Sequence, residues 1–327
     1  MGGGATSAKD VRMAAIYRSP GSRVGGSRRA SPSRAAGLPM HDPPELRRAV
    51  DAWWAGLAAA FRREGLDDVP ERLTRLPFTE DVWRLPNLLL TQTCGYDIVR
   101  GWRRRFAYVA THRYAAPGCV GAEHRSFVVV RADAPARDLG ELRGLRCAVN
   151  GYSSHSGCNA LRGLVAPLAR GGRFFASVLV SGSHDASAEA VAGGAADVAA
   201  IDCISHALLK RCRPRLMRSL RAIAETASVP AAPYVTQARF PAEIVDRLRA
   251  GIVRATEDPR LQAVRDELLI GGVEILPAAA YDRIGDMEAA AERAGYRELS
   301  PTWRTRANDA LARWTRRRGQ ASRENPS

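Results

Sequence analysis

The chain contains almost no lysine. Of its 327 residues, 49 are lysine or arginine, but lysine occurs only at positions 9 and 210. This scarcity argues against Schiff-base chemistry, which needs a lysine held in a pocket. The glycine motifs G-x-x-x-x-G-K-[ST] and G-x-G-x-x-G are absent as well, so no motif supports nucleotide binding.

Long apolar runs are also missing from the sequence. No segment approaches the roughly 20 apolar residues that span a bilayer. Near the N-terminus the apolar run covers only residues 13–17, and a secretion signal needs about 7–15 apolar residues. As written, the chain is therefore expected to be cytoplasmic and to have no membrane span.

Cysteine is present without metal-binding spacing. No pair has the CxxC spacing of a zinc cluster, so the sequence predicts no metal site. Cys147 and Cys203 lie in apolar surroundings typical of small buried residues. Cys94 and Cys158 lie in predicted pocket loops, where a catalytic thiol is the less favoured alternative because no base can be assigned to it. The six cysteines are at positions 94, 119, 147, 158, 203 and 212.

The formal charge of +15 is concentrated at the two ends. Residues 1–37 carry seven basic and one acidic residue, giving +6, and residues 303–327 carry seven basic and two acidic residues, giving +5. A uniformly basic groove is not indicated, so no nucleic-acid partner is expected. Residues 1–35 lack apolar periodicity, which predicts a disordered basic tail. Residues 303–327 predict a basic helix or tail, whose Trp stripe packs on the body or, alternatively, binds a membrane surface or nucleic acid.

The most informative stretch covers residues 147–161. An apolar strand ends there at the turn pair Asn150-Gly151, three serines follow, and a helical pattern of leucines and valine comes next. The first turn of a helix has unpaired N–H groups and a partial positive charge, to which Ser153, Ser154 and Ser156 would add hydroxyl donors. The stretch therefore predicts an anion site that needs no lysine or arginine. The alternative is simple N-capping by one serine.

A second stretch repeats the order of strand, polar loop and helix. An apolar strand over residues 174–180 leads to Ser183-His184, a short helix follows, and another strand ends at Asp202. Strands that alternate with helices predict a parallel sheet, and ligands bind outside the carboxyl ends of such strands. The serine loop, Ser183-His184 and Asp202 are therefore expected to meet at one edge.

The remaining segments complete a two-lobed pattern, for which the chain is long enough. We expect a short strand at 38–40, a helix at 45–63 capped by Asp42, and another strand within 70–77. A buried strand at 88–90 leads to residues 91–96, which open a helix and add hydroxyl and backbone donors. The strongly β-forming run at 124–131 is interpreted as the first crossing into the second lobe.

Residues 181–202 resemble the phosphonate- and phosphate-type solute-binding proteins of ABC transporters. Residues 150–157 lie where that family places its serine-rich anion loop. Residues 38–42 are similar to the family's first strand and the loop after it, and residues 92–96 to another ligand-facing loop. The resemblance covers about residues 36–300.

The resemblance implies an α/β, two-lobed periplasmic-binding-protein-like fold, with a mostly parallel sheet flanked by helices in each lobe and two hinge crossings. Lobe 1 would comprise residues 36–128 and 230–302, and lobe 2 residues 129–229. The implied function is capture of a small oxyanion, phosphate- or phosphonate-like, in the cleft between the lobes. The implied partners are the membrane subunits of an ABC transporter, the implied location is periplasmic, and no cofactor is implied.

The predicted ligand-binding residues come from both lobes. Asp202 would accept a proton from a protonated oxyanion or bind an amino group of the ligand; its alternative role is to cap the next helix. The full predicted set is Met40, His41, Asp42, Thr93, Gly95, Tyr96, Asn150, Ser153, Ser154, His155, Ser156, Gly157, Ser183, His184 and Asp202.

Two other functions remain open. The first is an enzyme on the same fold that uses Cys94, Cys158 or a histidine. The nucleophile-elbow pattern G-x-S-x-G fails around Ser153, because position 155 is histidine, and fails on both sides of Ser156. The second is a cytoplasmic ligand sensor that contacts a partner through its basic ends.

Overall fold

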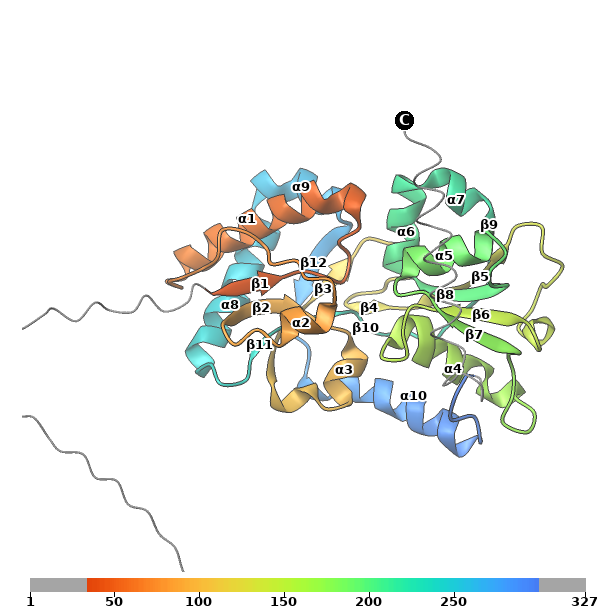
Figure 1. The fold of residues 1–327 in the computed structure, drawn as a ribbon. Helices are drawn as coiled ribbons and strands as arrows, with labels where there is room; N and C mark the ends of the chain where they lie inside the picture. The colour runs from red at the N-terminus through yellow and green to blue at the C-terminus, as the bar shows by residue number, and fades with distance from the viewer. Residues whose placement is uncertain (1–33, 300–327) are drawn as a thin grey trace, which may run out of the picture. The chain divides into compact units, whose positions relative to one another are not determined.

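The computed structural model describes residues 34–299, which belong to one compact unit. Two five-stranded sheets, each covered by helices, make up this part of the chain (Figure 1). The predicted α/β fold with two flanked sheets is confirmed. The tails predicted at residues 1–35 and 303–327 lie almost wholly outside the described residues.

The first sheet combines strands from both halves of the chain. β1 and β2 are parallel, whereas β11 runs antiparallel to β2 and β3, and β12 runs antiparallel to β3. The expectation of a mostly parallel sheet is therefore wrong for the first lobe, because β11 enters from the second lobe and β12 follows it through a helical crossover, so both strands run against β3. The strand order is β1 (Ala35–Gly37), β2 (Leu88–Gln92), β11 (Pro233–Gln237), β3 (Phe106–Tyr114) and β12 (Ile270–Glu274).

Helix α1 (Arg47–Arg63) supplies the largest side chains of the first core. Its apolar residues recur every three or four positions, so they share one face, and the sheet and α8 (Ala242–Glu257) cover that face. The indole of Trp53 donates to the Tyr234 hydroxyl on β11 at 3.0 Å, which fixes α1 on the sheet. The other helical segments here are η1 (Pro44–Leu46), α2 (Thr79–Trp83), α3 (Gly95–Val99), η2 (Trp102–Arg104), η6 (Pro259–Leu261) and α9 (Gln262–Glu267).

In the second sheet, the three strands that end at the cavity are parallel. β7, β6 and β8 run in one direction, and β5 runs against β8 and β9. The strand order is β7 (Ser177–Val180), β6 (Arg146–Val149), β8 (Val198–Asp202), β5 (Ser126–Arg131) and β9 (Leu220–Glu225). The helical segments are η3 (Gly140–Leu142), a π-helical turn η4 (His155–Asn159), α4 (Ala160–Val165), η5 (Ala166–Leu168), α5 (His184–Ala192), α6 (Cys203–Cys212) and α7 (Pro214–Arg218).

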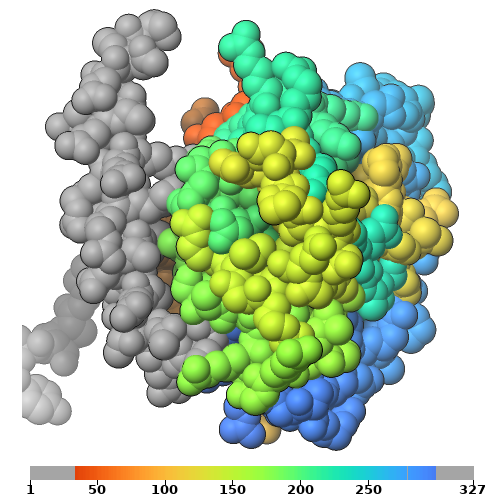
Figure 2. Space-filling model, turned by 90° about the vertical axis from the view of Figure 1, so that its right-hand side faces the viewer, coloured from red at the N-terminus to blue at the C-terminus, as the bar shows by residue number. Residues whose placement is uncertain are grey.

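Two chain crossings join the sheets, and β4 (Glu123–His124) pairs with β10 (Val229–Pro230) between them. A third connection is α10 (Asp282–Arg293), which follows η7 (Ala278–Tyr281) and contacts both α3 and α4. In Figure 2 this blue segment runs along the lower edge of the face formed by the second sheet's yellow-green segments. The second sheet begins at Ser126, slightly before the lobe boundary expected from the sequence.

Two local expectations are wrong, and one strand was not expected. The first strand lies at Ala35–Gly37 rather than 38–40, because Pro39 has no N–H to continue the pairing. Residues 70–77 form no strand, and within them Thr74 donates a backbone hydrogen bond to Ala36. β12 was not predicted, because its Gly271-Gly272 pair is typical of a turn.

Candidate functional site

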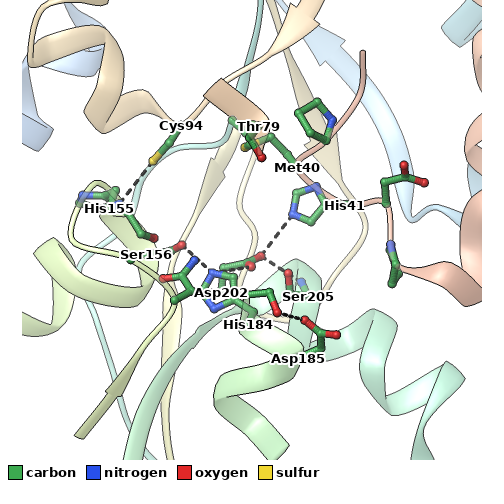
Figure 3. A pocket seen from close by; sticks show the side chains of 18 of the residues that line it. Met40, His41, Thr79, Cys94, His155, Ser156, His184, Asp185, Asp202 and Ser205 are labelled. Carbon is green, nitrogen blue, oxygen red and sulfur yellow. Dashed lines mark hydrogen bonds and ion pairs between the residues drawn. The ribbon is translucent and has the colours of Figure 1, made fainter. Parts of the chain in front are cut away.

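A cavity of about 620 Å³ lies between the two sheets, where β6, β7 and β8 end. Figure 3 shows Met40, His41, Thr79 and Cys94 on one side of it and His184, Asp202 and Ser205 on the other. Twelve of the fifteen predicted ligand residues line this cavity: Met40, His41, Asp42, Gly95, Asn150, Ser153, Ser154, His155, Ser156, Ser183, His184 and Asp202.

The serine loop is held in place by its own hydrogen bonds. The Ser154 hydroxyl accepts from the Gly157 N–H at 3.1 Å, so Ser154 is the N-cap of the π-helical turn. The Ser156 carbonyl accepts from the Ser126 hydroxyl at 2.9 Å, which ties the loop to β5. The Gly157 N–H, which the sequence predicted to face an anion, is therefore used within the loop.

His184 connects the loop to the end of β8. It is the first residue of α5, which Ser183 caps through the Ala186 N–H. The His184 Nε2 atom lies 2.9 Å from Ser156 Oγ and 3.2 Å from Asp202 Oδ2. Burial lowers the pKa of His184 although the Asp202 charge opposes this shift.

Asp202 is the centre of this cluster. Its Oδ1 accepts from the Ile204 and Ser205 N–H groups at 3.0 and 2.9 Å, so it caps α6 as the alternative interpretation expected. Its Oδ1 also lies 3.4 Å from His41 Nε2, and the Tyr114 hydroxyl lies 3.4 Å from the other nitrogen of that ring. Burial alone would raise the pKa of Asp202, but His184 and His41 hold it well below its usual value. The carboxylate is therefore ionised, and its hydrogen-bonding capacity is taken up by protein groups.

This cluster differs from a serine-protease-like relay. In such a relay the histidine contacts the serine through one ring nitrogen and the aspartate through the other. In His184 both Ser156 and Asp202 contact the same atom, Nε2. Asp202 therefore cannot hold the tautomer in which that atom is a free base toward the serine.

The described residues that line the cavity include no lysine or arginine. Three lining carboxylates are paired with arginines further out. Asp42 accepts from Arg75 at 2.5 Å, and Glu45 accepts from Arg213 at 2.7 Å across the two sheets. Asp42 therefore does not cap α1, whose preceding turn has Pro43 at its N-cap. The third lining carboxylate, Asp185, lies 3.6 Å from the same arginine as Glu45.

Asp97 is a lining acid whose pKa is raised. Burial and the neighbouring Glu80 raise its pKa to about 7. Asp97 lies on α3, on the first-sheet side of the cavity. Anionic groups of a ligand are therefore favoured at the serine and histidine side and disfavoured near Asp97.

Three predicted ligand residues, Thr93, Tyr96 and Gly157, lie outside the lining formed by the described residues. The Tyr96 hydroxyl donates to Glu288 of α10 at 2.6 Å and accepts from Arg162 of α4 at 3.3 Å. Tyr96 thus joins the two sheets through α10. Gly157 contributes space, since a Cβ atom there would lie 1.8 Å from Asn150 Oδ1.

His155 lines the cavity but lies apart from the cluster of His41, His184 and Asp202 (Figure 3). Its Nδ1 accepts from the Asn159 amide at 3.2 Å, and its backbone N–H donates to Cys94 Sγ at 3.3 Å. Burial lowers the pKa of His155 to about 3, so the ring is neutral.

Cys94, predicted in a pocket loop, lines the cavity, whereas several other lining residues were not predicted, among them Thr79, His124, Asp185 and Ser205. A usable signal existed for Ser205, because it follows Asp202 in the first turn of the predicted helix. For His124 the sequence gives no comparable signal. Burial lowers the pKa of His124 to about 4, with a smaller opposing contribution from Asp202.

Within residues 34–299, no group of three or more histidine, cysteine, aspartate or glutamate side chains could hold a metal ion. No helix in the same range is long and apolar enough to cross a membrane.

The family model for the periplasmic substrate-binding protein of phosphonate ABC transporters matches residues 91–281, more than half of the chain. No curated protein matches the chain.

Several solved structures share the fold. A binding-protein component of an ABC phosphonate transporter from Pseudomonas aeruginosa aligns with a TM-score of 0.66 at 16% identity, covering 89% of this chain and 99% of that one. PhnD1 from Prochlorococcus marinus, in complex with methylphosphonate, gives 0.65 at 17%, covering 80% and 100%. XAC2383 from Xanthomonas citri, bound to chloride, gives 0.61 at 18%, covering 80% and 98%. With the match over residues 91–281, the chain belongs to the family of periplasmic substrate-binding proteins of phosphonate ABC transporters.

Proposed function

We propose that the cavity binds a small oxyanion of the phosphonate or phosphate class through neutral hydrogen-bond donors. The observation that carries the proposal is the contact of Ser156 Oγ with His184 Nε2, beside the ionised Asp202. The carboxylate orients the Nε2 hydrogen toward itself and Ser156, so the Ser156 hydroxyl need not donate to the ring and is left to donate to a ligand. Hydroxyl donors of this kind bind oxyanions strongly when water is excluded.

The remaining contacts follow from the lining. Ser154 keeps its hydroxyl hydrogen while accepting from Gly157, and Ser153 lies exposed at the rim. The first turns of α5 and α6 add the partial positive charge of helix N-termini on the same side. His41 and Thr79 would approach the ligand from the first-sheet side.

Asp202 receives a different role from the one expected from the sequence. Since it accepts hydrogen bonds from Ile204, Ser205 and His41 and contacts His184, we assign it to orienting the two histidines. The ligand would then contact the histidines and serines and would not need an amino group at Asp202.

The same proposal includes movement of the lobes and a transport partner. The lobes, residues 36–128 with 230–302 and residues 129–229, would open by hinge bending at the two crossings. Opening would break the contacts of Glu45 with Arg213 and of His41 with Asp202. The closed, loaded protein would deliver its ligand to the membrane subunits of an ABC transporter.

A thermal-shift screen of the full chain tests the ligand class. Methylphosphonate, which is bound in the Prochlorococcus marinus relative, and phosphate are compared with sulfate and acetate at equal ionic strength. Ligand at about one hundred times its Kd stabilises a folded protein by roughly 2.7 kcal/mol, so a concentration-dependent rise in Tm is expected. A rise with acetate alone, or none with any oxyanion, contradicts the proposal.

The enzyme alternative is tested in the same samples. Burial raises the pKa of both Cys94 and Cys158 to about 12, so both thiols are protonated at neutral pH, which does not favour a cysteine nucleophile. Phosphorus NMR after prolonged incubation with methylphosphonate is expected to show the ligand unchanged. A new phosphorus signal that depends on the protein would support catalysis instead.

A further inference from the structure

Cys119 and Cys203 meet next to the site although 84 residues separate them. Their Sγ atoms lie 3.3 Å apart, and both cysteines are free thiols. Cys203 is fully buried, whereas Cys119 is half-buried and partly reachable from solvent. Cysteines that only fill space in a core can both be buried. A thiol pair that reacts with an external oxidant needs one thiol that solvent can reach, as Cys119 is.

The backbone is arranged to allow this close approach. Cys119 lies in the turn between β3 and β4, where its N–H donates to the Ala116 carbonyl at 3.0 Å. Cys203 is the first residue of α6, and its N–H donates to the Arg125 carbonyl at 2.9 Å. Gly118 has a φ of +96°, and a Cβ atom there would lie 2.9 Å from Cys203 Cβ, so only glycine lets the turn come this near.

We propose that Cys119 and Cys203 form a redox-active pair that closes to an intramolecular disulfide when a small disulfide such as oxidised glutathione reaches the Cys119 turn. The Cys119 thiolate attacks one sulfur of oxidised glutathione, and the first glutathione thiolate leaves. The Cys203 thiol loses its proton and attacks Cys119 Sγ, and the second glutathione leaves. The two protein thiols lose two protons and two electrons, and the oxidant takes up both as two molecules of glutathione.

The two sulfurs have different roles in this sequence. The contact between the two sulfurs lowers the pKa of Cys119 and, together with burial, raises the pKa of Cys203. Cys119 is therefore the attacking thiol and Cys203 the resolving one. The two Sγ atoms are 3.3 Å apart, and a disulfide bond is about 2.05 Å long. Small side-chain movements are therefore enough to bring the sulfurs to bonding distance.

The disulfide would fix one end of the site. Cys203 directly follows Asp202, and the Cys119 turn is joined to the first sheet, where the Ala115 N–H donates to the Leu269 carbonyl. A bond between them ties the start of α6 to the first-sheet side next to β4. Oxidation should then slow the exchange of a bound ligand, a consequence that rests on the proposed function.

The pair itself is tested without any ligand. The reduced full chain is incubated with oxidised glutathione, alkylated and digested with trypsin. We expect the loss of two of the six thiols, a mass lower by two hydrogens, and a cross-link between tryptic peptides 114–125 and 174–210. Retention of all six thiols, or glutathione held on Cys119 without the cross-link, overturns the proposal.

Single variants identify the attacking and resolving thiols. Cys203→Ala should accumulate protein carrying one glutathione on Cys119, and Cys119→Ser should give neither product at this position. Cys212→Ser, which changes a half-buried cysteine at the other end of α6, should form the cross-link like the unaltered chain. A methylphosphonate exchange rate that is equal before and after oxidation would reject only the effect on the site, because the thiol count is independent of ligand.

Discussion

The Ser156 hydroxyl oxygen lies 2.9 Å from His184 Nε2, and the same nitrogen lies 3.2 Å from the Asp202 carboxylate. An ionised carboxylate can only accept hydrogen bonds, so Asp202 favours the His184 tautomer that carries its hydrogen on Nε2. Ser156 does not need to donate its own hydrogen to the ring. Asp202 would repel an anion that contacted it directly. By pairing with His184 instead, it leaves the Ser156 hydroxyl hydrogen available to the anion.

Asp202→Asn should weaken oxyanion binding. Asparagine keeps an oxygen for the Ile204 and Ser205 N–H groups, but its NH₂ group would face the His184 N–H, and two donors cannot pair. Loss of one hydrogen bond to a charged ligand costs roughly 1.5–3 kcal/mol, about tenfold or more in Kd, measured by calorimetric titration.

The matched control for that variant is Asp197→Asn. Asp197 pairs with Arg146 at 2.6 Å next to β8 but outside the cavity lining. The Asp197→Asn variant should bind methylphosphonate with the same affinity as the unaltered chain. Equal affinities of the Asp202 and Asp197 variants would show that Asp202 only caps α6.

Gly157→Ala should disturb the site more than the fold. The new methyl carbon would lie 1.8 Å from Asn150 Oδ1, so the Asn150 side chain must move away from the serine loop. Overpacking of this kind costs roughly 1–3 kcal/mol of stability, and ligand affinity should fall as well. Chemical denaturation and titration are measured on both proteins.

Gly163→Ala controls for the change from glycine to alanine in a helical segment. At Gly163 the nearest atom to the new carbon is Met287 Cε at 3.7 Å, an ordinary contact. This variant should be as stable as the unaltered chain or more so, by roughly 0.5–1 kcal/mol, with unchanged affinity. An affinity loss shared by both glycine variants would argue against a specific role for Asn150.

His206→Phe should make the protein less sensitive to acid. Burial lowers the pKa of His206 from 6.5 to about 4, with a smaller contribution from Lys210. The centroids of the His206 and Phe127 rings lie 4.8 Å apart. Between these pH values the unfolded chain binds a proton that the folded chain does not, so stability falls as the pH falls. Phenylalanine keeps the ring contact and removes the titration.

The measurement for His206→Phe is the unfolding free energy from pH 7 to 4.5. The pH slope should be shallower by a fraction of a proton, because one histidine with a pKa of about 4 when folded and 6.5 when unfolded changes the proton difference by less than one. Some slope remains, since burial also lowers the pKa of His112 and His124 to about 4. A slope equal to that of the unaltered chain would mean that His206 titrates normally in the fold.

Much of the second sheet could be predicted from the sequence because its information is local. Each strand there is followed by a polar loop and a helix, and parallel strands bring those loops to one edge. The serine loop, His184 and Asp202 were therefore predicted near one another, and all of them line the cavity. The family resemblance implied ligand-binding roles for the same residues.

The first-sheet side of the site could not be predicted in the same way because its contacts are distant in sequence. Tyr96 points to Glu288, which lies 192 residues away on a helix that also contacts α4. Asp42 is paired by Arg75 from an irregular segment, and His41 reaches Asp202 across the two sheets. These partners are far apart in the sequence. The sequence could therefore place each side chain in a loop, but it could not predict which residue the side chain contacts.

The central claim is that the serine hydroxyls bind an oxyanion. Calorimetric titration of the double variant Ser154→Ala with Ser156→Ala, beside the unaltered chain, tests it most directly with methylphosphonate and phosphate. Each lost bond to a charged ligand is worth roughly 1.5–3 kcal/mol, so affinity should fall by about tenfold to several-thousandfold if the effects add. Loss of the Ser154 cap alone costs about 1 kcal/mol of stability. Unchanged affinity with lowered stability would contradict the account and leave these serines as helix caps.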